Sequence, residues 1–398
     1  MNNEAQHIHY PVEQLLQEQG EYLPLEFLLR EGRLAYADYE AWRNGELDTL
    51  DEALFGDRQH IKQQLLQAAD YLQRRGWQAE TITYHAWRND RARTLRFSQN
   101  DALDSCFHQR YRKPQDQPQL DMFTDAPATN RVSDIIRALV NRDAAEARRQ
   151  LEGLYDAAPD HVRLGELERL VEAAESLDTP VGDIAAELRL LEESLTPLAE
   201  NLLGKDSRNL LVPLWRRLGN ALHGRAYHAA RPMLHVSYTA TQAMDWDDAR
   251  HAVEQVPHWQ SDAVLLQRHA HACDQLHRRC DALLSWFTLC WQFPQQSNAL
   301  EASTDAELRQ QWDAFLGLEP ELPTPTFPAW LLLTRPGLCK ILTGRRHDTA
   351  NCPASYRTLH RLQGNTAAQA DDNIALRARL KQQEPALFQH YLSRQRQA

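Results

Sequence analysis

The sequence is poor in cysteine, in glycine and in long apolar runs. Its 398 residues include 6 Cys, 15 Gly and 19 Pro. Six cysteines in a chain of this length do not form a disulfide framework, so we expect a reducing compartment. The low glycine and proline content excludes collagen-like and low-complexity chains. The apolar stretch Ala282–Trp291 is broken by Ser285 and Thr288 and falls short of the roughly 20 residues that a membrane-spanning helix needs.

The composition is that of a globular protein with an acidic balance. Hydrophobic residues make up 42% of the chain, charged residues make up 25%, and the formal net charge is −11. Such a charge argues against general binding to polyanions, although a local basic face remains compatible with it. Met1–Tyr10 is polar and lacks the apolar centre of a secretory signal. We therefore predict a cytoplasmic protein without membrane association.

Helical periodicity dominates the N-terminal 113 residues. Aromatic residues recur at three-residue spacing before the turn-forming pair Asn44-Gly45, and Asp57 stands as an N-cap before a longer apolar stripe. The period then changes, because residues 80–87 and 92–98 are rich in β-forming side chains around a turn-like run. The sequence predicts a helical domain that carries a small β-hairpin.

Two proline-rich stretches separate this domain from regions of further helical periodicity. From Arg131 onward, apolar stripes alternate with short breaks, a pattern typical of antiparallel helix pairs. We expect a mainly α fold, either a tetratricopeptide-like array or a helical bundle. Its expected segments are an N-terminal helical domain with the hairpin (1–113), a linker (114–130), a helical-repeat-like domain (131–318), a Pro-rich linker (319–328) and a C-terminal helical segment (329–398).

Asn141–Pro159 resembles the second helix of a tetratricopeptide repeat. In that pattern an alanine is followed by an apolar residue four positions later and by a proline twelve positions later, and Ala147, Leu151 and Pro159 occupy these places. A degenerate second copy begins within 244–257. The resemblance implies stacked helix pairs whose concave surface binds proteins or peptides.

The segment Gln119-Leu120-Asp121-Met122-Phe123 is similar to the pentapeptide by which bacterial replication and repair proteins bind the DNA sliding clamp. An extended segment would offer Met122 and Phe123 to an apolar pocket, while the amide of Gln119 would supply directional hydrogen bonds. The alternative is that the apolar residues of this segment pack on their own domain. The resemblance makes the sliding clamp a candidate partner.

Helices followed by a hairpin also follow the order of a winged helix. If the helix after Asp57 were the recognition helix, Arg58 and Lys62 would lie at its entry end. The hairpin would supply contacts to phosphates from Arg88, Arg91, Arg93 and Arg96. Residues 81–113 hold 7 Lys/Arg against 3 Asp, but residues 1–80 hold 15 Asp/Glu against 7 Lys/Arg and would repel DNA. Nucleic-acid binding is an alternative that the charge balance does not favour.

Histidine, cysteine and arginine gather in two further places. We expect His269, Cys273, His277 and Cys280 on one side of a single helix, where one metal ion cannot reach four ligands spread along about 16 Å. We therefore predict buried cysteines, no metal and no cofactor. The basic stretch 335–361 contains Arg345 and Arg346, which suit a phosphate or an acidic partner; an ordinary exposed loop is the alternative.

No familiar enzyme motif occurs in the chain. A phosphate-binding glycine loop, a nucleophile elbow and a His-Glu-x-x-His pair are all absent from the sequence. We therefore favour a non-enzymatic scaffold or adaptor that binds partner proteins through helical repeats. The alternative is an accessory factor of DNA replication or repair that the sliding clamp recruits.

Overall fold

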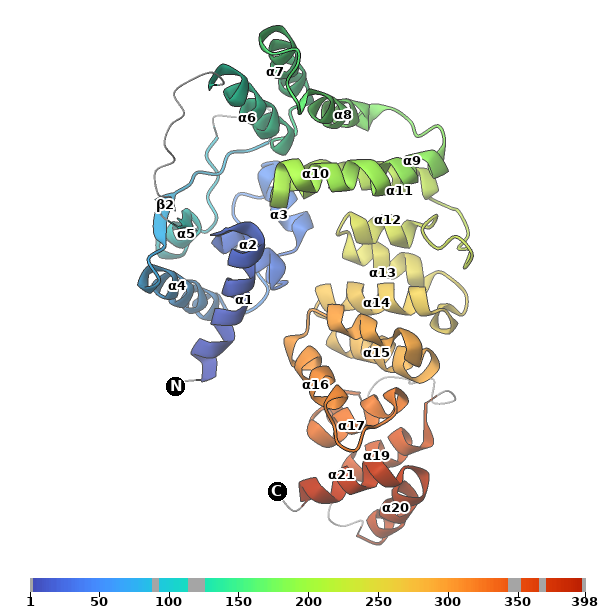
Figure 1. Ribbon diagram of the computed structural model, residues 1–398. Coiled ribbons are helices and arrows are strands. Elements are labelled where there is room, and N and C mark those ends of the chain that lie inside the picture. Colours follow the sequence, from blue (N-terminus) through green and yellow to red (C-terminus); the bar gives the residue numbers. More distant parts are fainter. Residues whose placement is uncertain (1–2, 88–92, 114–125, 343–351, 365–369, 396–398) are drawn as a thin grey trace. The chain divides into compact units, whose positions relative to one another are not determined.

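The structure of the chain is a computed structural model that describes residues 3–87, 93–113, 126–342, 352–364 and 370–395. The chain divides into two compact units (Figure 1). Unit 1 comprises Met1–Arg225 and Met233–Asp245, and unit 2 comprises Ala226–Pro232 and Trp246–Ala398. Helices form most of both units, so the predicted mainly α fold with a small β element is confirmed.

Five helices open unit 1, and the start of α4 falls where the sequence predicts it, after Asp57. They are α1 (Asn3–Gln19), α2 (Pro24–Arg30), α3 (Tyr36–Arg43), α4 (Arg58–Arg74) and α5 (Asp101–Phe107). α1 ends at Gly20, whose φ of +69° suits glycine. The carboxylate of Asp57 caps α4 by accepting a hydrogen bond from the backbone N–H of His60 at 2.7 Å. The aromatic stripe of α3 faces the core, with Trp42 fully buried.

A three-stranded antiparallel sheet accompanies these helices. Its strands are β1 (Glu21–Tyr22), β2 (Gln78–Thr81) and β3 (Gln109–Arg112), in the order β1-β3-β2. The pairing of Gln78 with Arg112 was not expected from the sequence. The two arms of the expected hairpin meet only at the bridge between His85 and Thr94 among the residues described.

The second arm of that hairpin is held by other parts of unit 1. The carbonyl of Phe97 accepts a hydrogen bond from the amide of Leu50 at 2.9 Å, and the carboxylate of Asp104 accepts one from the amide of Phe97 at 2.7 Å. Phe97 is fully buried and stacks on Phe107. These contacts draw the arm into the core of unit 1.

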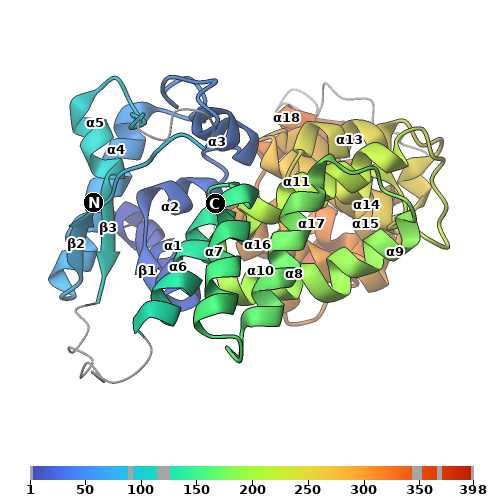
Figure 2. The same cartoon turned by 90° about the horizontal axis from the view of Figure 1, so that it is seen from above.

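The remaining helices of unit 1 are α6 (Ala126–Val140), α7 (Ala144–Ala157), α8 (Leu164–Glu175), α9 (Ile184–Leu190), α10 (Thr196–Leu203), α11 (Ser207–Leu222) and α12 (Val236–Gln242). A π-helical turn, Leu191–Leu195, joins α9 to α10. Figure 2 shows α6, α7 and α8 side by side, in green. The apolar stripes predicted for these three helices are buried, with Ile135, Leu151 and Leu167 fully enclosed. Short loops and apolar faces thus produce the expected helix pairs.

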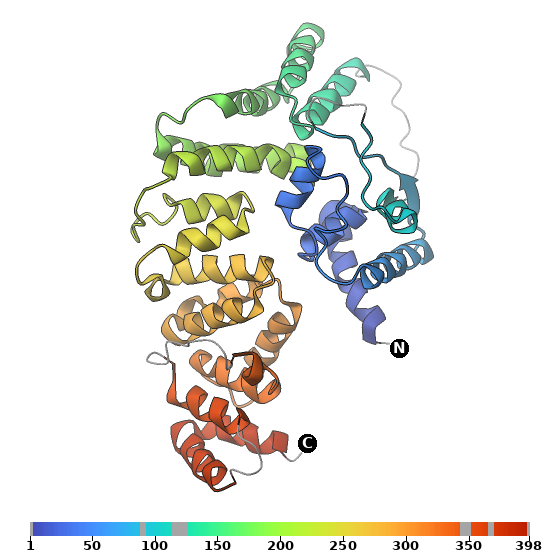
Figure 3. The same cartoon turned by 180° about the vertical axis from the view of Figure 1, so that it is seen from behind.

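Unit 2 contains α13 (Trp246–Glu254), α14 (Ala263–Gln275), α15 (Arg279–Gln292), α16 (Ala306–Leu316), α17 (Phe327–Thr334), α18 (Leu338–Leu342), α19 (Ala354–Gly364), α20 (Ala370–Gln383) and α21 (Pro385–Gln395). Figure 3 shows α13, α14 and α15, in yellow to orange, as neighbouring layers. The core of unit 2 is rich in aromatic residues. The ring centres of Trp312 and Phe327 lie 4.9 Å apart, for example.

One local expectation for unit 2 needs correction. The prediction that one helix carries His269 through Cys280 is wrong, because α14 ends at Gln275 and His277 adopts a left-handed φ of +54°. The last two residues of the Pro-rich stretch 319–328 belong to α17, which begins at the fully buried Phe327. Proline at the first turn of α17 is compatible with a helix start.

No helix within the described ranges combines the length and the hydropathy that a membrane crossing requires.

Candidate functional site

A stack of one aromatic ring and two guanidinium groups lies at the centre of unit 1. The Cζ atom of Arg142 is 4.1 Å from the centre of the Trp87 ring, and the Cζ atom of Arg43 is 4.7 Å from it. Tyr39 meets the same ring edge-on, with ring centres 5.8 Å apart. Cations over an indole face are attracted by its quadrupole, more strongly away from water. All of these side chains are largely buried, so the stack is a rigid wall.

Arg142 also ties α3 to the rest of unit 1. It lies in the turn between α6 and α7 with a left-handed φ of +56°. Its Nη1 is 2.5 Å from the carboxylate of Glu40, and its Nε donates to the carbonyl of Asn209 at 2.8 Å. Arg216 pairs with the other oxygen of Glu40. The two ion pairs offset the cost of removing the Glu40 carboxylate from water, so a charged group can be buried here.

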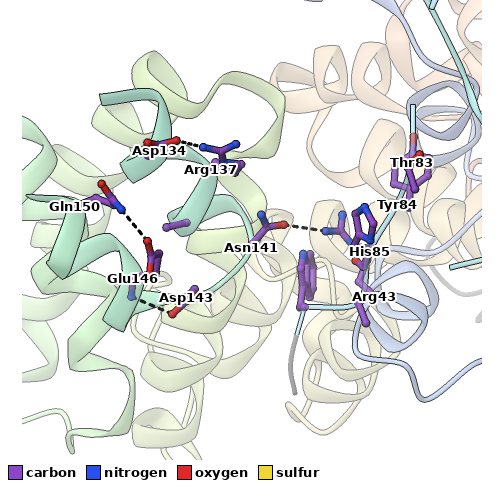
Figure 4. Close-up of a pocket in the computed structure, with 13 residues that line it drawn as sticks. Arg43, Thr83, Tyr84, His85, Asp134, Arg137, Asn141, Asp143, Glu146 and Gln150 are labelled. Carbon is purple, nitrogen blue, oxygen red and sulfur yellow. Dashed lines mark hydrogen bonds and ion pairs between the residues drawn. The ribbon is translucent and has the colours of Figure 1, made fainter. Parts of the chain in front are cut away.

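A polar pocket of about 630 Å³ opens beside this stack (Figure 4). Its volume lies in the range typical of ligand and peptide sites. One wall is the irregular strand 83–87 together with Arg43. The other wall comes from α6, the turn after it and the first turns of α7. The residues that line the pocket are Arg43, Thr83, Tyr84, His85, Ala86, Trp87, Asp134, Arg137, Ala138, Asn141, Asp143, Glu146 and Gln150.

Arg43 joins the two walls. Its Nε donates to the carbonyl of His85 at 3.1 Å, its Nη1 to the hydroxyl of Tyr39 at 2.8 Å, and its Nη2 to the side-chain oxygen of Asn141 at 3.1 Å (Figure 4). Three oriented donors hold the guanidinium in place and spread its charge over neutral acceptors. Burial raises the pKa of Tyr84 well above its usual value, so this phenol remains neutral.

The helical wall carries three carboxylates. Asp143 caps α7 by accepting a hydrogen bond from the amide of Glu146 at 3.0 Å. Gln150 donates to the carboxylate of Glu146 at 2.8 Å, and Asp134 pairs with Arg137 (Figure 4). Two cations, Arg43 and Arg137, also line the pocket. The charged residues that line the pocket therefore have a net charge of −1. All three carboxylates lie on the helical wall.

The predicted nucleic-acid residues that are described lie in a different part of unit 1. Arg58 and Lys62, on the first turns of α4, line a second cavity of about 670 Å³ with Asp48, Asp51 and Glu52. The other two arginines are paired with carboxylates: Arg93 with Asp48 at 2.7 Å, and Arg96 with Asp101 at 2.5 Å. These carboxylates lower the local positive potential that phosphate binding needs. Arg88, Arg91, Arg345 and Arg346 lie outside the described residues, as does Gln119–Phe123.

In unit 2, Glu254, His269 and Ser285 form a hydrogen-bonded chain. Nδ1 of His269 is 2.8 Å from the hydroxyl of Ser285, and Nε2 is 3.2 Å from the carboxylate of Glu254. Desolvation lowers the pKa of His269, although Glu254 opposes that effect. An acid, a histidine and a serine are the parts of a hydrolytic triad. Ser285 is only 3% exposed, and these contacts link α13, α14 and α15 within the core of unit 2.

Cys273 lies beside this chain, with its sulfur 3.7 Å from both ring nitrogens of His269. The thiol is fully buried, as expected for a core cysteine, and burial raises its pKa to about 12. Within the residues that the structure describes, no group of three or more His, Cys, Asp or Glu side chains is placed to hold a metal ion.

The pocket between 83–87 and α6–α7 has no signature of its own in the sequence. There Trp87 belongs to a predicted hairpin and Asn141 begins a repeat-like helix. One local signal was present, because Asn141-Arg142-Asp143 interrupts two apolar stripes with a polar turn. The stack of Arg142 on Trp87 joins positions far apart in the chain, which no local spacing reveals.

The chain matches no known protein-family model, no curated protein sequence and no solved structure.

Proposed function

We propose that this protein is a non-enzymatic, cytoplasmic scaffold that binds partner proteins through its helix pairs, in the manner of tetratricopeptide-like arrays. The observation that carries the proposal is the acidic flank of α7 and α8. Residues 143–200, which run from α7 into α10, hold 15 Asp/Glu against 5 Lys/Arg. Within residues 143–175, which comprise α7 and α8, the count is 9 Asp/Glu against 4 Arg. Glu152, Asp156 and Glu172 of this flank are exposed. A surface with an excess of one charge sign attracts an oppositely charged partner and selects against others.

The helix pairs support the same proposal. α6 and α7 are joined by a short turn and pack together, and α8 packs on α7. The buried stripes leave the opposite faces of these helices free to carry the acidic side chains. Stacked pairs of this kind present extended surfaces that suit proteins or peptides.

Charge-dependent capture tests this function. Full-length protein should retain partners from a native bacterial lysate at low salt and release them as salt is raised, because exposed charges are screened. A variant with Glu152→Gln, Asp156→Asn and Glu172→Gln should lose them. Any partner identified by mass spectrometry is then purified and its binding is measured directly.

The matched control removes three exposed carboxylates from unit 2: Glu301→Gln, Asp313→Asn and Glu321→Gln. It should retain the same partners as the wild type. Capture that is equal in both variants, or absent from the wild type, would overturn the scaffold proposal.

A second candidate function is recruitment to a bacterial sliding clamp. The observation that favours it is Gln119–Phe123, which falls between the end of β3 and the start of α6. A docking segment between two helical regions could tether the scaffold to the clamp. Direct binding to DNA is less favoured than clamp binding, because Arg93 and Arg96 already pair with Asp48 and Asp101.

A further inference from the structure

The strand that lines the pocket has one free edge. On one side, the carbonyl of Tyr84 accepts a hydrogen bond from the amide of Leu95 at 2.8 Å, and the amide of Ala86 donates to the carbonyl of Arg93 at 3.3 Å. Successive residues of an extended chain direct their amide and carbonyl groups to opposite sides. The groups of Thr83, His85 and Trp87 therefore face the other side.

Arg43 occupies only part of that other side. Its side chain donates to the carbonyl of His85, and its carbonyl accepts from the amide of Trp87 at 2.6 Å. The amide and carbonyl of Thr83 and the amide of His85 have no hydrogen-bond partner among the residues described. Thr83 and His85 are both exposed, and both line the pocket with Arg43. An edge with unpaired main-chain groups is a template for an added strand.

The wall opposite this edge carries a net negative charge. Asp134, Asp143 and Glu146 line it with one cation, Arg137, which pairs with Asp134. Glu146 also pairs with Arg149, so a basic side chain of a ligand would share these carboxylates with cations already present. The donors of Arg43 are committed to Tyr39, His85 and Asn141, so this cation is held at the strand side of the pocket. A strand that enters between the walls would have hydrogen-bond partners on one side and carboxylates on the other.

We propose that this pocket is a docking site for an extended, basic peptide segment of a partner protein. The main chain of the peptide adds to the free edge at Thr83 and His85, and a lysine or arginine side chain meets the carboxylates of Asp134, Asp143 and Glu146. Strand addition supplies affinity, and the alternating side chains supply specificity. The inference rests on the proposed scaffold function and names the kind of partner segment that the scaffold takes.

Charge selects this occupant over the alternatives. The chain's own segment 114–125 contains Asp116, Asp121 and Asp125 and no lysine or arginine. It would bring like charge against the acidic wall, and a nucleic acid would do the same. A basic peptide is the occupant whose charge complements the lining.

The test is calorimetric titration of full-length protein with a blocked hexapeptide of alternating valine and arginine. We expect a dissociation constant on the order of tens of micromolar at low salt, typical of a short flexible peptide. The same peptide with glutamate in place of arginine should bind at least tenfold more weakly. A version N-methylated at alternate amides, made in both registers, should lose binding in one register because a ladder hydrogen bond is removed.

Variants of the chain locate the site. Thr83→Pro removes an unpaired amide hydrogen and fixes φ at residue 83. It should weaken binding at least tenfold, whereas Thr83→Ala should leave it within twofold. Asp134→Asn with Glu146→Gln should also weaken binding at least tenfold. The matched control, Asp160→Asn with Asp178→Asn, removes two exposed carboxylates outside the pocket and should have little effect. Thermal melting confirms that each variant is folded.

Absence of binding, equal binding of the glutamate peptide, or equal binding of both N-methylated peptides would overturn the inference. So would tighter binding of a synthetic 114–125 peptide. These failures are distinguishable from failure of the scaffold function, because the capture experiment depends on Glu152, Asp156 and Glu172, which do not line the pocket. Loss of capture in that flank variant together with no peptide binding would leave the scaffold standing and remove only this site.

Discussion

The guanidinium of Arg142 lies over the ring of Trp87, with its Cζ atom 4.1 Å from the ring centre. Trp87 is the last residue of the irregular strand 83–87 of the pocket, and Arg142 lies in the turn between α6 and α7. This contact, with the ion pair from Arg142 to Glu40, connects the N-terminal elements of unit 1 to its helix pairs. The pocket exists because these two elements are held against each other.

The stack should therefore contribute to stability. Arg142→Met removes the charge but keeps an apolar stem, so that Glu40 retains only Arg216 as a partner. We expect the free energy of unfolding to fall by about 3 kcal/mol, as when one partner of a buried ion pair is removed. Trp87→Leu should cost a similar amount through lost packing, about 3 kcal/mol. A double-mutant cycle by urea unfolding should give a coupling of about 1 kcal/mol. The exposed Arg137→Met is the control, and additive effects at Trp87 and Arg142 would contradict the stack.

A buried carboxylate in unit 2 should make stability depend on pH. Asp274 accepts hydrogen bonds from the indole of Trp286 at 3.1 Å and the hydroxyl of Ser303 at 2.5 Å. Burial nevertheless raises its pKa to about 6, above the usual aspartate value of 3.8. A raised carboxyl pKa means that the folded state binds the proton more tightly than the unfolded state. Its contribution to stability is therefore lost as the pH rises through about 6.

The comparison of wild type with Asp274→Asn isolates this effect. Between about pH 7.5 and pH 5, the wild type should gain about 1 kcal/mol of unfolding free energy relative to the variant, as the linkage relation requires for this difference in pKa. Asp313→Asn, on the exposed side of α16, should show the wild-type pH dependence. Chemical denaturation at each pH provides the measurement. An equal pH dependence in wild type and Asp274→Asn would show that Asp274 titrates normally.

The cysteines should divide into two classes of reactivity. Cys106 and Cys280 are partly exposed, whereas the other four are buried: Cys273, Cys290, Cys339 and Cys352. The thiolate is the reactive form, and burial raises the pKa of Cys273 to about 12. A disulfide reagent at neutral pH should therefore modify at most two thiols in the native state and all six after unfolding. Cys280→Ser should remove one reactive thiol and Cys273→Ser none; rapid modification of four or more would contradict the packing of unit 2.

The ends of a helix could be predicted from the sequence where they need a particular residue type. Asp57 capped its helix, and Gly20 ended another, because an N-cap oxygen and a left-handed glycine are needed at those points. His277 had no such signal. A left-handed histidine looks like any helical residue in a sequence, so the break between α14 and α15 was missed.

The features that the sequence did not predict depend on contacts between residues far apart in the chain. The pairing of β2 with β3 joins Gln78 to Arg112, and the pocket combines Arg43, Trp87 and Asn141 from three separate elements. Each of these residues has an ordinary local explanation, such as a helix end, a strand or a turn. Only the packing of the core brings them together. Sequence patterns of period two or of about 3.6 carry no information on such distant pairs.

The segment Gln119-Leu120-Asp121-Met122-Phe123 yields the last prediction. A synthetic peptide spanning residues 114–127 should bind a purified bacterial sliding clamp with micromolar affinity, since a flexible peptide loses ordering entropy on binding. Replacing both Met122 and Phe123 with Ala should cost about 2 kcal/mol or more, as for residues that fill a pocket. Replacing Thr124 and Asp125 with Ala should change little and serves as the control. Fluorescence anisotropy of the labelled peptide measures each affinity.

The same two substitutions in the full chain separate clamp docking from packing within the protein. If Gln119–Phe123 binds the clamp, Met122→Ala with Phe123→Ala should abolish clamp binding by the full chain and leave its melting temperature unchanged. If these side chains pack on their own domain, the double substitution should lower the melting temperature, because buried apolar area is lost. A normal melting temperature combined with no clamp binding by the wild type would remove both explanations. The clamp would then no longer be a candidate partner, and the acidic flank of α7 and α8 would remain as the basis for partner binding.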